Sequence, residues 1–184
     1  MTGQKAKMLA GELYFANDVE LNPARRRAQA LVAQFNALPP NSPAEARAVL
    51  GELFGALGPG VLVQPTLRCD YGFNITIGAR SFLNYNCVLL DCNRIAIGEA
   101  VQIAPGVHIY TATHPLDAAL RRSGAEQALP VVIGDGVWIG GGAIVCPGVT
   151  IGENTVVGAG SVVVGDLPPN VLAVGNPCRV VRAL

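Results

Sequence analysis

Aliphatic residues recur at every sixth position towards the end of the chain, and this spacing is the strongest pattern in the sequence. The six aliphatics are Ile133, Ile139, Val145, Ile151, Val157 and Val163. A second apolar or small residue stands two positions before each of them, at Val131, Val137, Ala143, Val149, Thr155 and Ser161. Residues two apart face the same side of a strand, so each hexad predicts a short strand with two inward side chains.

A strand that ends in a turn every six residues winds the chain into triangular coils, with three hexads to a coil. Each coil stacks about 4.8 Å from the next through parallel ladder hydrogen bonds, and the aliphatics fill the prism. Glycine follows several of the aliphatics, at corners where a Cβ would crowd the bend. A sandwich or barrel would instead show longer alternating runs, with turns about every 8–12 residues. The pattern therefore predicts a β-solenoid.

The same register continues upstream and indicates where the solenoid begins. It is present at Ile77, Leu83 and Leu89 and, after a two-residue slip near Cys92, at Ile97, Ile103 and Ile109. The preceding residues are rich in Ala, Leu, Glu, Arg and Gln, which favour helix. We therefore expect an N-terminal helical segment over residues 1–58 and a solenoid domain over residues 59–184.

Two amphipathic helices are expected within the helical segment. The first has Asn22 as its N-cap and Pro23 at its first position. The second has Ser42 as its cap, followed by a proline, and Glu45 three residues on to close a capping box. The three arginines at 25–27 fall in the first turns of the first helix, where a solvated surface is the expected role.

A segment of about twenty residues interrupts the solenoid between Ile109 and Val131. This inserted loop is expected over residues 111–130, and long loops in compact domains are more often functional than idle. It carries His114, one of two histidines in the chain. An imidazole is suited to proton transfer near neutral pH, although a structural histidine would look the same in sequence. His108 precedes an inward aliphatic, so it is expected outside the prism, at the surface or a subunit contact.

Composition narrows the classes of partner. Thirteen basic and thirteen acidic side chains balance, so no net field draws the molecule to nucleic acid or to an anionic membrane. No apolar run approaches the ~20 residues that cross a bilayer, and a cytoplasmic protein is expected. The five cysteines show no paired metal spacing, which argues against a disulfide scaffold or a zinc site and favours small apolar fillers.

Several segments together resemble the hexapeptide-repeat acyltransferases, and in particular their galactoside and maltose O-acetyltransferase group. The segments are MLAGELY (8–14), RCDYGFNITIG (68–78), YNCVLLD (85–91), IYTATHPLD (109–117), RRSG (121–124), IGDGVWIGGGAIVCPGVTIG (133–152) and VGNPCRVVR (174–182). Together these segments occur in order from one end of the chain nearly to the other. The resemblance implies a mostly β fold, a left-handed parallel β-helix with an N-terminal helical segment; the left hand comes from the family and not from the spacing.

The resemblance also implies a function, which is the metal-free transfer of the acetyl group of acetyl-CoA to a hydroxyl of a sugar or glycoside. His114 would be the general base. Asn84 would contact the acceptor or the reacting acetyl group, although a corner residue tolerant of positive φ is the alternative. Asp70 and Tyr71 lie on a stretch similar to the acceptor-binding side of these enzymes. The residues implied for acetyl-CoA are Trp138, Gly141, Gly142, Ala159, Arg179 and Arg182, with the Gly141 N–H donating to the oxyanion.

The resemblance further implies a C3 homotrimer, with the active site in the groove between neighbouring prisms. His114 of one subunit would face Trp138 and Gly141 of another.

One departure from the family pattern lies near the end of the solenoid. Relatives usually read Thr-Lys before the aspartate where this chain has Val164 and Gly165, so any lysine contact with CoA is missing there.

Other functions remain as alternatives. A γ-class carbonic anhydrase shares the β-helix but binds zinc through three histidines, and this chain has two. A non-catalytic scaffold solenoid would need neither His114 nor its loop, and would tend to show a regular outward-facing pattern that the sequence lacks. Acetyltransferases that act on antibiotics or on nucleotide-linked amino sugars stay open, but they typically lack the MLAGELY leader.

Overall fold

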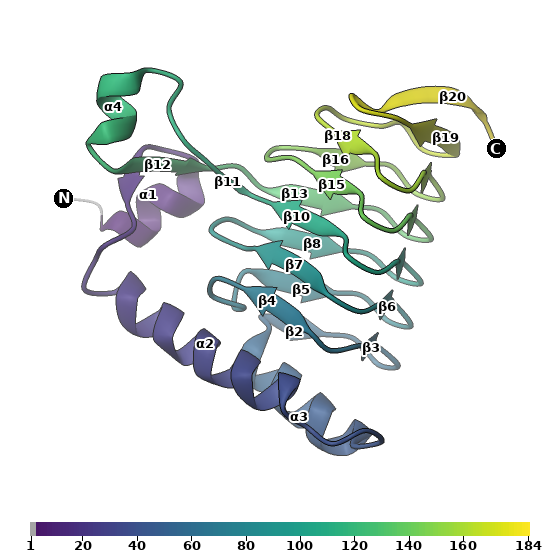
Figure 1. Cartoon of the computed structure of the whole chain (residues 1–184), viewed down its shortest axis with the longest axis horizontal. Coiled ribbons are helices and arrows are strands. Elements are labelled where there is room, and N and C mark those ends of the chain that lie inside the picture. The colour runs from purple at the N-terminus through teal and green to yellow at the C-terminus, as the bar shows by residue number, and fades with distance from the viewer. Residues whose placement is uncertain (1–2) are drawn as a thin grey trace.

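The protein begins with helices and then winds into a prism of three parallel sheets (Figure 1). The structure is a computed structural model that describes residues 3–184, so the first two residues of the predicted helical segment lie outside it. The N-terminal elements are α1 (Gln4–Ala10), β1 (Tyr14–Phe15), α2 (Leu21–Asn36) and α3 (Pro43–Leu53). Helices α2 and α3 lie across the lower end of the prism in Figure 1. Within the described residues, no helix has both the length and the apolar character needed to cross a membrane.

Asp18 rather than Asn22 fixes the start of α2. Its Oδ1 accepts hydrogen bonds from two backbone N–H groups at 2.9 and 3.3 Å, and the helix already begins at Leu21. The prediction of Asn22 as the N-cap was therefore wrong. Ser42 is the cap residue of α3, as expected, but its side chain makes no capping hydrogen bond, so the predicted capping box with Glu45 does not form.

Three parallel sheets form the faces of the prism, which we name A, B and C in the order in which the chain meets them. Face A contains β2 (Ala56–Leu57), β5 (Ile75–Ile77), β8 (Ile95–Ile97), β13 (Val131–Ile133) and β16 (Thr150–Ile151). Face B contains β3 (Leu62–Val63), β6 (Phe82–Leu83), β9 (Gln102–Ile103), β14 (Trp138–Ile139), β17 (Val156–Val157), β19 (Val171–Val174) and β20 (Arg179–Ala183). Face C contains β4 (Leu67–Cys69), β7 (Cys87–Leu90), β10 (His108–Tyr110), β15 (Ile144–Val145) and β18 (Val162–Val163). The strands pair in parallel within each face, except that β20 runs antiparallel to β19.

The interior of the prism holds the predicted ladder of side chains. The six aliphatics spaced six apart, and the six partners that precede them, are each at most 1% exposed, which confirms the period. The inward hydroxyls are hydrogen-bonded: Thr155 donates to a backbone carbonyl at 2.7 Å and Ser161 accepts a backbone N–H at 3.0 Å. Close stacking explains the corner glycines, because a Cβ at Gly140 would lie 2.5 Å from the backbone nitrogen of Ala159.

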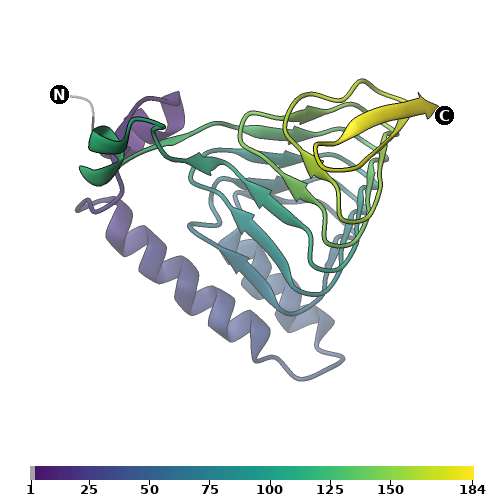
Figure 2. The same ribbon diagram turned by 45° about the horizontal axis from the view of Figure 1, so that its top comes forward.

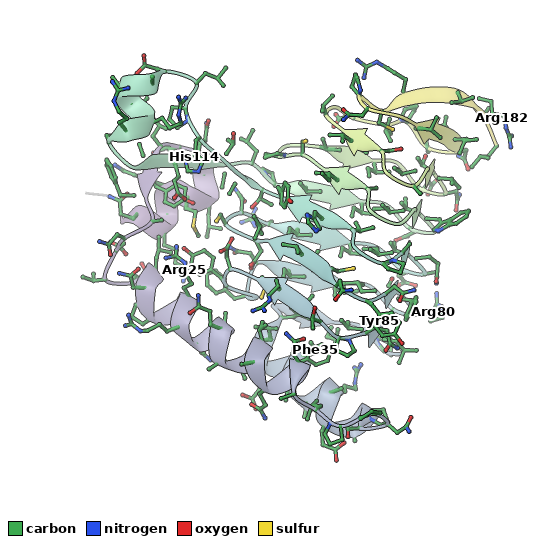
Figure 3. All side chains as sticks on the ribbon, in the orientation of Figure 1. Arg25, Phe35, Arg80, Tyr85, His114 and Arg182 are labelled. Atoms are coloured by element: carbon green, nitrogen blue, oxygen red, sulfur yellow. The ribbon has the colours of Figure 1, made fainter. Side chains whose placement is uncertain are left out.

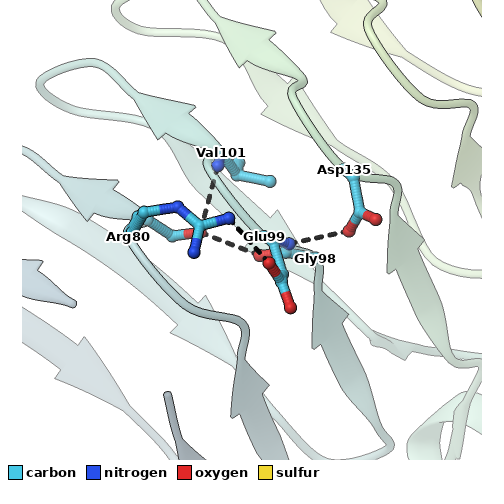
Figure 4. Close-up of polar contacts among 6 residues, drawn as sticks. Arg80, Gly98, Glu99, Val101 and Asp135 are labelled. Atoms are coloured by element: carbon cyan, nitrogen blue, oxygen red, sulfur yellow. Dashed lines mark hydrogen bonds and ion pairs between the residues drawn. The ribbon is translucent and has the colours of Figure 1, made fainter. Parts of the chain in front are cut away.

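Polar side chains join successive turns at the corner between faces A and B (Figure 4). The Ser81 hydroxyl donates to the Gly98 carbonyl at 2.8 Å, and Asp135 Oδ1 accepts the Glu99 N–H at 2.7 Å. Arg80 and Glu99 form an ion pair of 2.8 Å on the surface, where such pairs contribute little stability. The backbone groups left unpaired where the strands end are thus satisfied locally.

The inserted segment leaves the prism at the corner between faces C and A and has structure of its own. It contains β11 (Ala112–Thr113), α4 (Ala118–Arg122) and β12 (Ala125–Ala128). β12 pairs antiparallel with β11 and also with β1 of the helical segment. Figure 2 shows this excursion projecting from the prism together with α1. A segment from the middle of the chain is therefore joined to its beginning.

Candidate functional site

The residues expected at the site fall into two groups on different corners of the prism. The loop group, at the corner between faces C and A, consists of His114, Asp70 and Tyr71. The corner column, which follows the corner between faces B and C, consists of Asn84, Gly141, Gly142 and Ala159. Figure 3 places His114 on one side of the molecule, and Arg182 and Tyr85, the neighbour of Asn84, on the other. One chain alone does not bring the two groups together.

His114 is held by the backbone of the inserted segment rather than by packing around its side chain. It directly follows β11, and its side chain is exposed. Arg121 donates to the carbonyls of Pro115 and Leu116 at 3.0 Å each, and Asp117 Oδ1 caps α4 by accepting a backbone N–H at 2.7 Å. These bonds fold the chain after His114 into a compact turn and leave the imidazole accessible to a ligand.

A buried carboxylate shapes the turn that carries Asp70 and Tyr71. Asp91 is 0% exposed. Its Oδ1 accepts the N–H groups of Asp70 at 3.0 Å and Tyr71 at 2.8 Å, and its Oδ2 accepts that of Asn74 at 3.3 Å. Burial raises the pKa of Asp91 to about 7, and the hydrogen bonds from backbone N–H groups act in the opposite direction. Asp91 was not predicted, because nothing in its sequence position distinguishes it from a solvated corner residue.

The side chain of Tyr71 connects this turn to Arg25 of α2. Its ring is 1% exposed, its hydroxyl accepts a hydrogen bond of 2.6 Å from Arg25 Nη2, and the guanidinium lies 5.2 Å from the ring centroid. Burial raises the pKa of the Tyr71 hydroxyl, while the charge of Arg25 lowers it. Arg25 was expected on the solvated surface, and that expectation was wrong, since it contacts the loop group.

Asp70 is half-buried and lies within a polar network. Its Oδ2 accepts a hydrogen bond of 3.4 Å from the Cys92 thiol, so Cys92 is more than the apolar filler that we expected. Burial raises the pKa of Asp70, Cys92 and Arg25 lower it, and Glu126 raises it. Glu126 in turn accepts a hydrogen bond of 2.9 Å from the hydroxyl of Tyr14. Within residues 3–184, no group of three or more His, Cys, Asp or Glu side chains is placed to hold a metal ion.

A polar pocket opens between the helical segment and the inserted segment. Its volume is about 690 Å³, and Phe15, Asn17, Arg25 and Glu126 contribute to its lining. Carboxylate, guanidinium and carboxamide groups hydrogen-bond hydroxyls, and a half-exposed aromatic ring can pack against the apolar face of a sugar. None of these four residues was predicted for the site. Glu126 lies far along the sequence from the other three, and the two segments meet only through the pairing of β1 with β12.

The corner column is a stack of tight turns that lie directly above one another. Backbone hydrogen bonds join Gly106 N–H to Tyr85 O (2.8 Å), Gly142 N–H to Pro105 O (2.9 Å) and Gly160 N–H to Gly141 O (2.9 Å). Asn84 stands at the base of the column, where its Oδ1 accepts the Tyr85 N–H at 2.8 Å, which leaves its NH₂ group to donate. The positive φ at this turn belongs to Asn86, at 62°, so left-handed backbone does not account for Asn84.

Two N–H groups of the column are unused. Among residues 3–184, no acceptor takes the N–H of Gly141 or of Ala159, and the two residues lie on successive turns, about 4.8 Å apart. The corresponding positions in the two turns below offer no such donor. The N–H of Tyr85 is already bonded to Asn84 Oδ1, and Pro105 has no N–H. The column therefore presents two donors on a surface of small residues.

Trp138 and two arginines lie on face B, which ends at the corner column. Trp138 lies on β14 and is 53% exposed. Arg179 and Arg182 lie on β20, and their guanidinium groups donate to the nearby carbonyls of Cys178 at 2.8 Å and Ala183 at 3.0 Å. Neither arginine takes part in the ion pairs found within residues 3–184, so both charges remain available to an anion.

Comparison with known proteins identifies close relatives of this chain. A family model described as the maltose acetyltransferase hexapeptide capping motif matches residues 7–58, and one described as bacterial transferase hexapeptide (six repeats) matches residues 130–165. The chain is similar to the crystal structure of a maltose O-acetyltransferase from Clostridium difficile 630, with 50% identity, coverage of 100% of this chain and 98% of that one, and a TM-score of 0.98. A galactoside acetyltransferase in complex with coenzyme A is 37% identical, with 100% and 92% covered and a TM-score of 0.96. Nodulation protein L of Rhizobium meliloti (strain 1021) is 49% identical, with 96% and 97% covered.

Proposed function

Because the chain belongs to the hexapeptide-repeat acetyltransferases, we propose that it transfers the acetyl group of acetyl-CoA to a hydroxyl of a sugar or glycoside. The observation that carries the choice of acceptor is the polar pocket beside the segment that bears His114. Its carboxylate, guanidinium and carboxamide groups suit a molecule rich in hydroxyls. The relatives described as maltose and galactoside acetyltransferases support the same class of acceptor.

His114 acts as the general base in this proposal. The acceptor hydroxyl attacks the thioester carbonyl carbon as its proton passes to the imidazole, which is suited to that transfer near neutral pH. The Gly141 N–H donates to the carbonyl oxygen as negative charge develops on it. The C–S bond then breaks, and the leaving thiolate takes the proton from the imidazolium. Asn84 would donate from its free NH₂ group to the acceptor or to the acetyl oxygen.

The corner column fits the extended arm of acetyl-CoA. Gly141 and Gly142 present no side chain, and the unused N–H of Ala159 lies one turn further along, where an amide carbonyl of the arm can accept a hydrogen bond. Trp138 would border this channel, and Arg179 and Arg182 would bind the phosphates at its end. Val164 and Gly165 follow β18 at the corner between faces C and A, the corner that also carries His114.

The position of the two groups on different corners supports a site shared between subunits. If three prisms pack around a threefold axis, His114 of one subunit can face Trp138 and Gly141 of its neighbour, and a C3 homotrimer then contains three complete sites. Exposed apolar side chains on face B, such as Leu62 (58%) and Trp138 (53%), suit contact with a neighbour.

The choice of acceptor can be tested with labelled acetyl-CoA and a panel of sugars, glycosides, antibiotics and nucleotide-linked amino sugars. We expect label on the sugars and glycosides, as an ester that mild base removes. Label found only on an antibiotic, or on the amine of an amino sugar, would overturn the proposed acceptor. The wild-type protein without acceptor is the control for hydrolysis of the thioester.

The phosphate contacts can be tested separately. The double variant Arg179→Ala, Arg182→Ala is expected to raise the KM for acetyl-CoA by about 100-fold or more, because hydrogen bonds to charged groups contribute about 1.5–3 kcal/mol each. The KM for the acceptor should change by less than about twofold. Arg80→Ala, which removes an exposed arginine at another corner, is the matched control. An equal rise in both KM values would mean that β20 has only a structural role.

A further inference from the structure

Asn93 joins three parts of the molecule that are distant in the sequence. Its side chain is buried, at 2% exposure. Its Nδ2 donates to the Met8 carbonyl near the end of α1 at 3.1 Å and to the Ala128 carbonyl at the end of β12 at 2.9 Å. Its Oδ1 accepts the N–H of the next residue at 2.7 Å. A single carboxamide thus ties the helical segment and the inserted segment to a corner of the prism.

Thr111 makes the matching contact at the base of the inserted segment. It is 0% exposed, and its Oγ1 donates to the Leu90 carbonyl at 2.6 Å and accepts the Asn93 N–H at 2.8 Å. Its own carbonyl accepts the N–H of Leu129, where the segment returns to the prism, at 2.8 Å. Thr111 therefore fixes the point at which the excursion departs and the point at which it returns.

His114 lies three residues beyond Thr111 and has an exposed side chain. Packing around the imidazole does not hold it, so its placement depends on where and in which direction the chain leaves the prism. The bonds of Thr111 and Asn93 determine that point. The two-residue slip in the hexad pattern falls at the same corner, and the buried polar residues Asp91 and Asn93 lie there.

We propose that Thr111 and Asn93 are positioning residues that set the placement of His114 and couple it to the N-terminal helical segment. This inference rests on the proposed role of His114 as the base. A catalytic group displaced by about 1 Å can lower the rate by about 10²-fold, so loosening this junction should act mainly on kcat.

The test compares two substitutions of Thr111, one that removes the hydroxyl and one that keeps it. Thr111→Val removes both hydroxyl bonds and is expected to lower kcat by about 10–100-fold, with little change in the KM for acetyl-CoA. Thr111→Ser keeps the hydroxyl and should retain most of the activity. Thr155→Val is the matched control, because the Thr155 hydroxyl also donates to a backbone carbonyl, at 2.7 Å, and accepts a backbone N–H, at 3.4 Å, but at the corner between faces A and B. Thr155→Val should lower the Tm about as much as Thr111→Val does, but it should keep kcat within about twofold of the wild-type value.

Two further measurements separate this inference from the proposed function. Amide hydrogen exchange should show faster exchange over residues 112–128 in Thr111→Val but not in Thr155→Val, whatever the role of His114. The double variant Thr111→Val, His114→Ala should be no slower than His114→Ala alone. Equal kcat and equal exchange in the two valine variants would overturn the positioning role. Full activity of His114→Ala would instead overturn the proposed base, and exchange would then still decide whether the junction holds the segment.

Discussion

Replacing His114 by alanine is expected to lower kcat by about 10²–10⁴-fold, the usual contribution of a general base. The Tm should stay nearly unchanged because the side chain is exposed, and the KM for acetyl-CoA should stay nearly unchanged because a general base takes the acceptor's proton and does not bind the donor. Steady-state kinetics with saturating acceptor, together with thermal unfolding, measure both quantities. The expected split between kcat and KM distinguishes a base from a residue that only binds.

His108 supplies the control for this experiment. It is the other histidine of the chain, half-buried on the outer side of β10, where its Nδ1 is hydrogen-bonded to the Tyr110 hydroxyl. His108→Ala should retain kcat within about threefold, since the loss of one partly exposed hydrogen bond has a small effect. Unchanged turnover in His114→Ala would rule out its role as the base, and an equal loss in both variants would point to a structural cause.

Mixing two inactive variants is expected to restore activity if the site is shared between subunits. His114→Ala lacks the base, and Gly141→Trp blocks the corner column. A site formed from the undamaged His114 of one subunit and the undamaged Gly141 of its neighbour would be complete. Random reassembly of an equal mixture should give roughly a quarter of the wild-type number of sites. Activity measured before and after subunit exchange provides the comparison.

Gly141 is a suitable position for the blocking substitution. A Cβ there would lie 3.2 Å from the Pro105 carbonyl oxygen, and the backbone does not have the positive φ found at Gly142, so a side chain can be accommodated with a small shift. At Gly140 a Cβ would meet the backbone of the next turn and disturb the fold. An active monomer in sedimentation, or no recovery despite proven exchange, would contradict the shared site.

The prism could be predicted from the sequence because its determinants are local and repeated. Each inward aliphatic has the same role in its own turn, so a period of six identifies the burial of residues such as Val145 and Ile151 without knowledge of their neighbours. Even Thr155 and Ser161, which are polar, were placed correctly, because the register rather than the hydropathy assigns them to the inside.

The surroundings of the loop group could not be predicted in the same way. Arg25 looked like part of a solvated arginine run, and only the fold brings it within 2.6 Å of the Tyr71 hydroxyl, 46 residues further on. Asp91 and Cys92 occupy the irregular corner, where the periodic pattern carries no information. Such contacts depend on how α2 and the irregular corner pack against the turn at Asp70 and Tyr71, which no local spacing determines.

The reversal of β20 has a consequence for the growth of filaments. A solenoid of parallel strands exposes unpaired backbone groups at its last turn, and another copy could add its own first turn there and continue the stack. The helices α2 and α3 cover one end, and at the other end β20 pairs antiparallel with β19 on face B. An antiparallel edge spaces its hydrogen bonds differently from a parallel one, so β3 of a second copy cannot extend it in register. On face B the chain thus ends its ladder with a strand that does not continue the parallel stack.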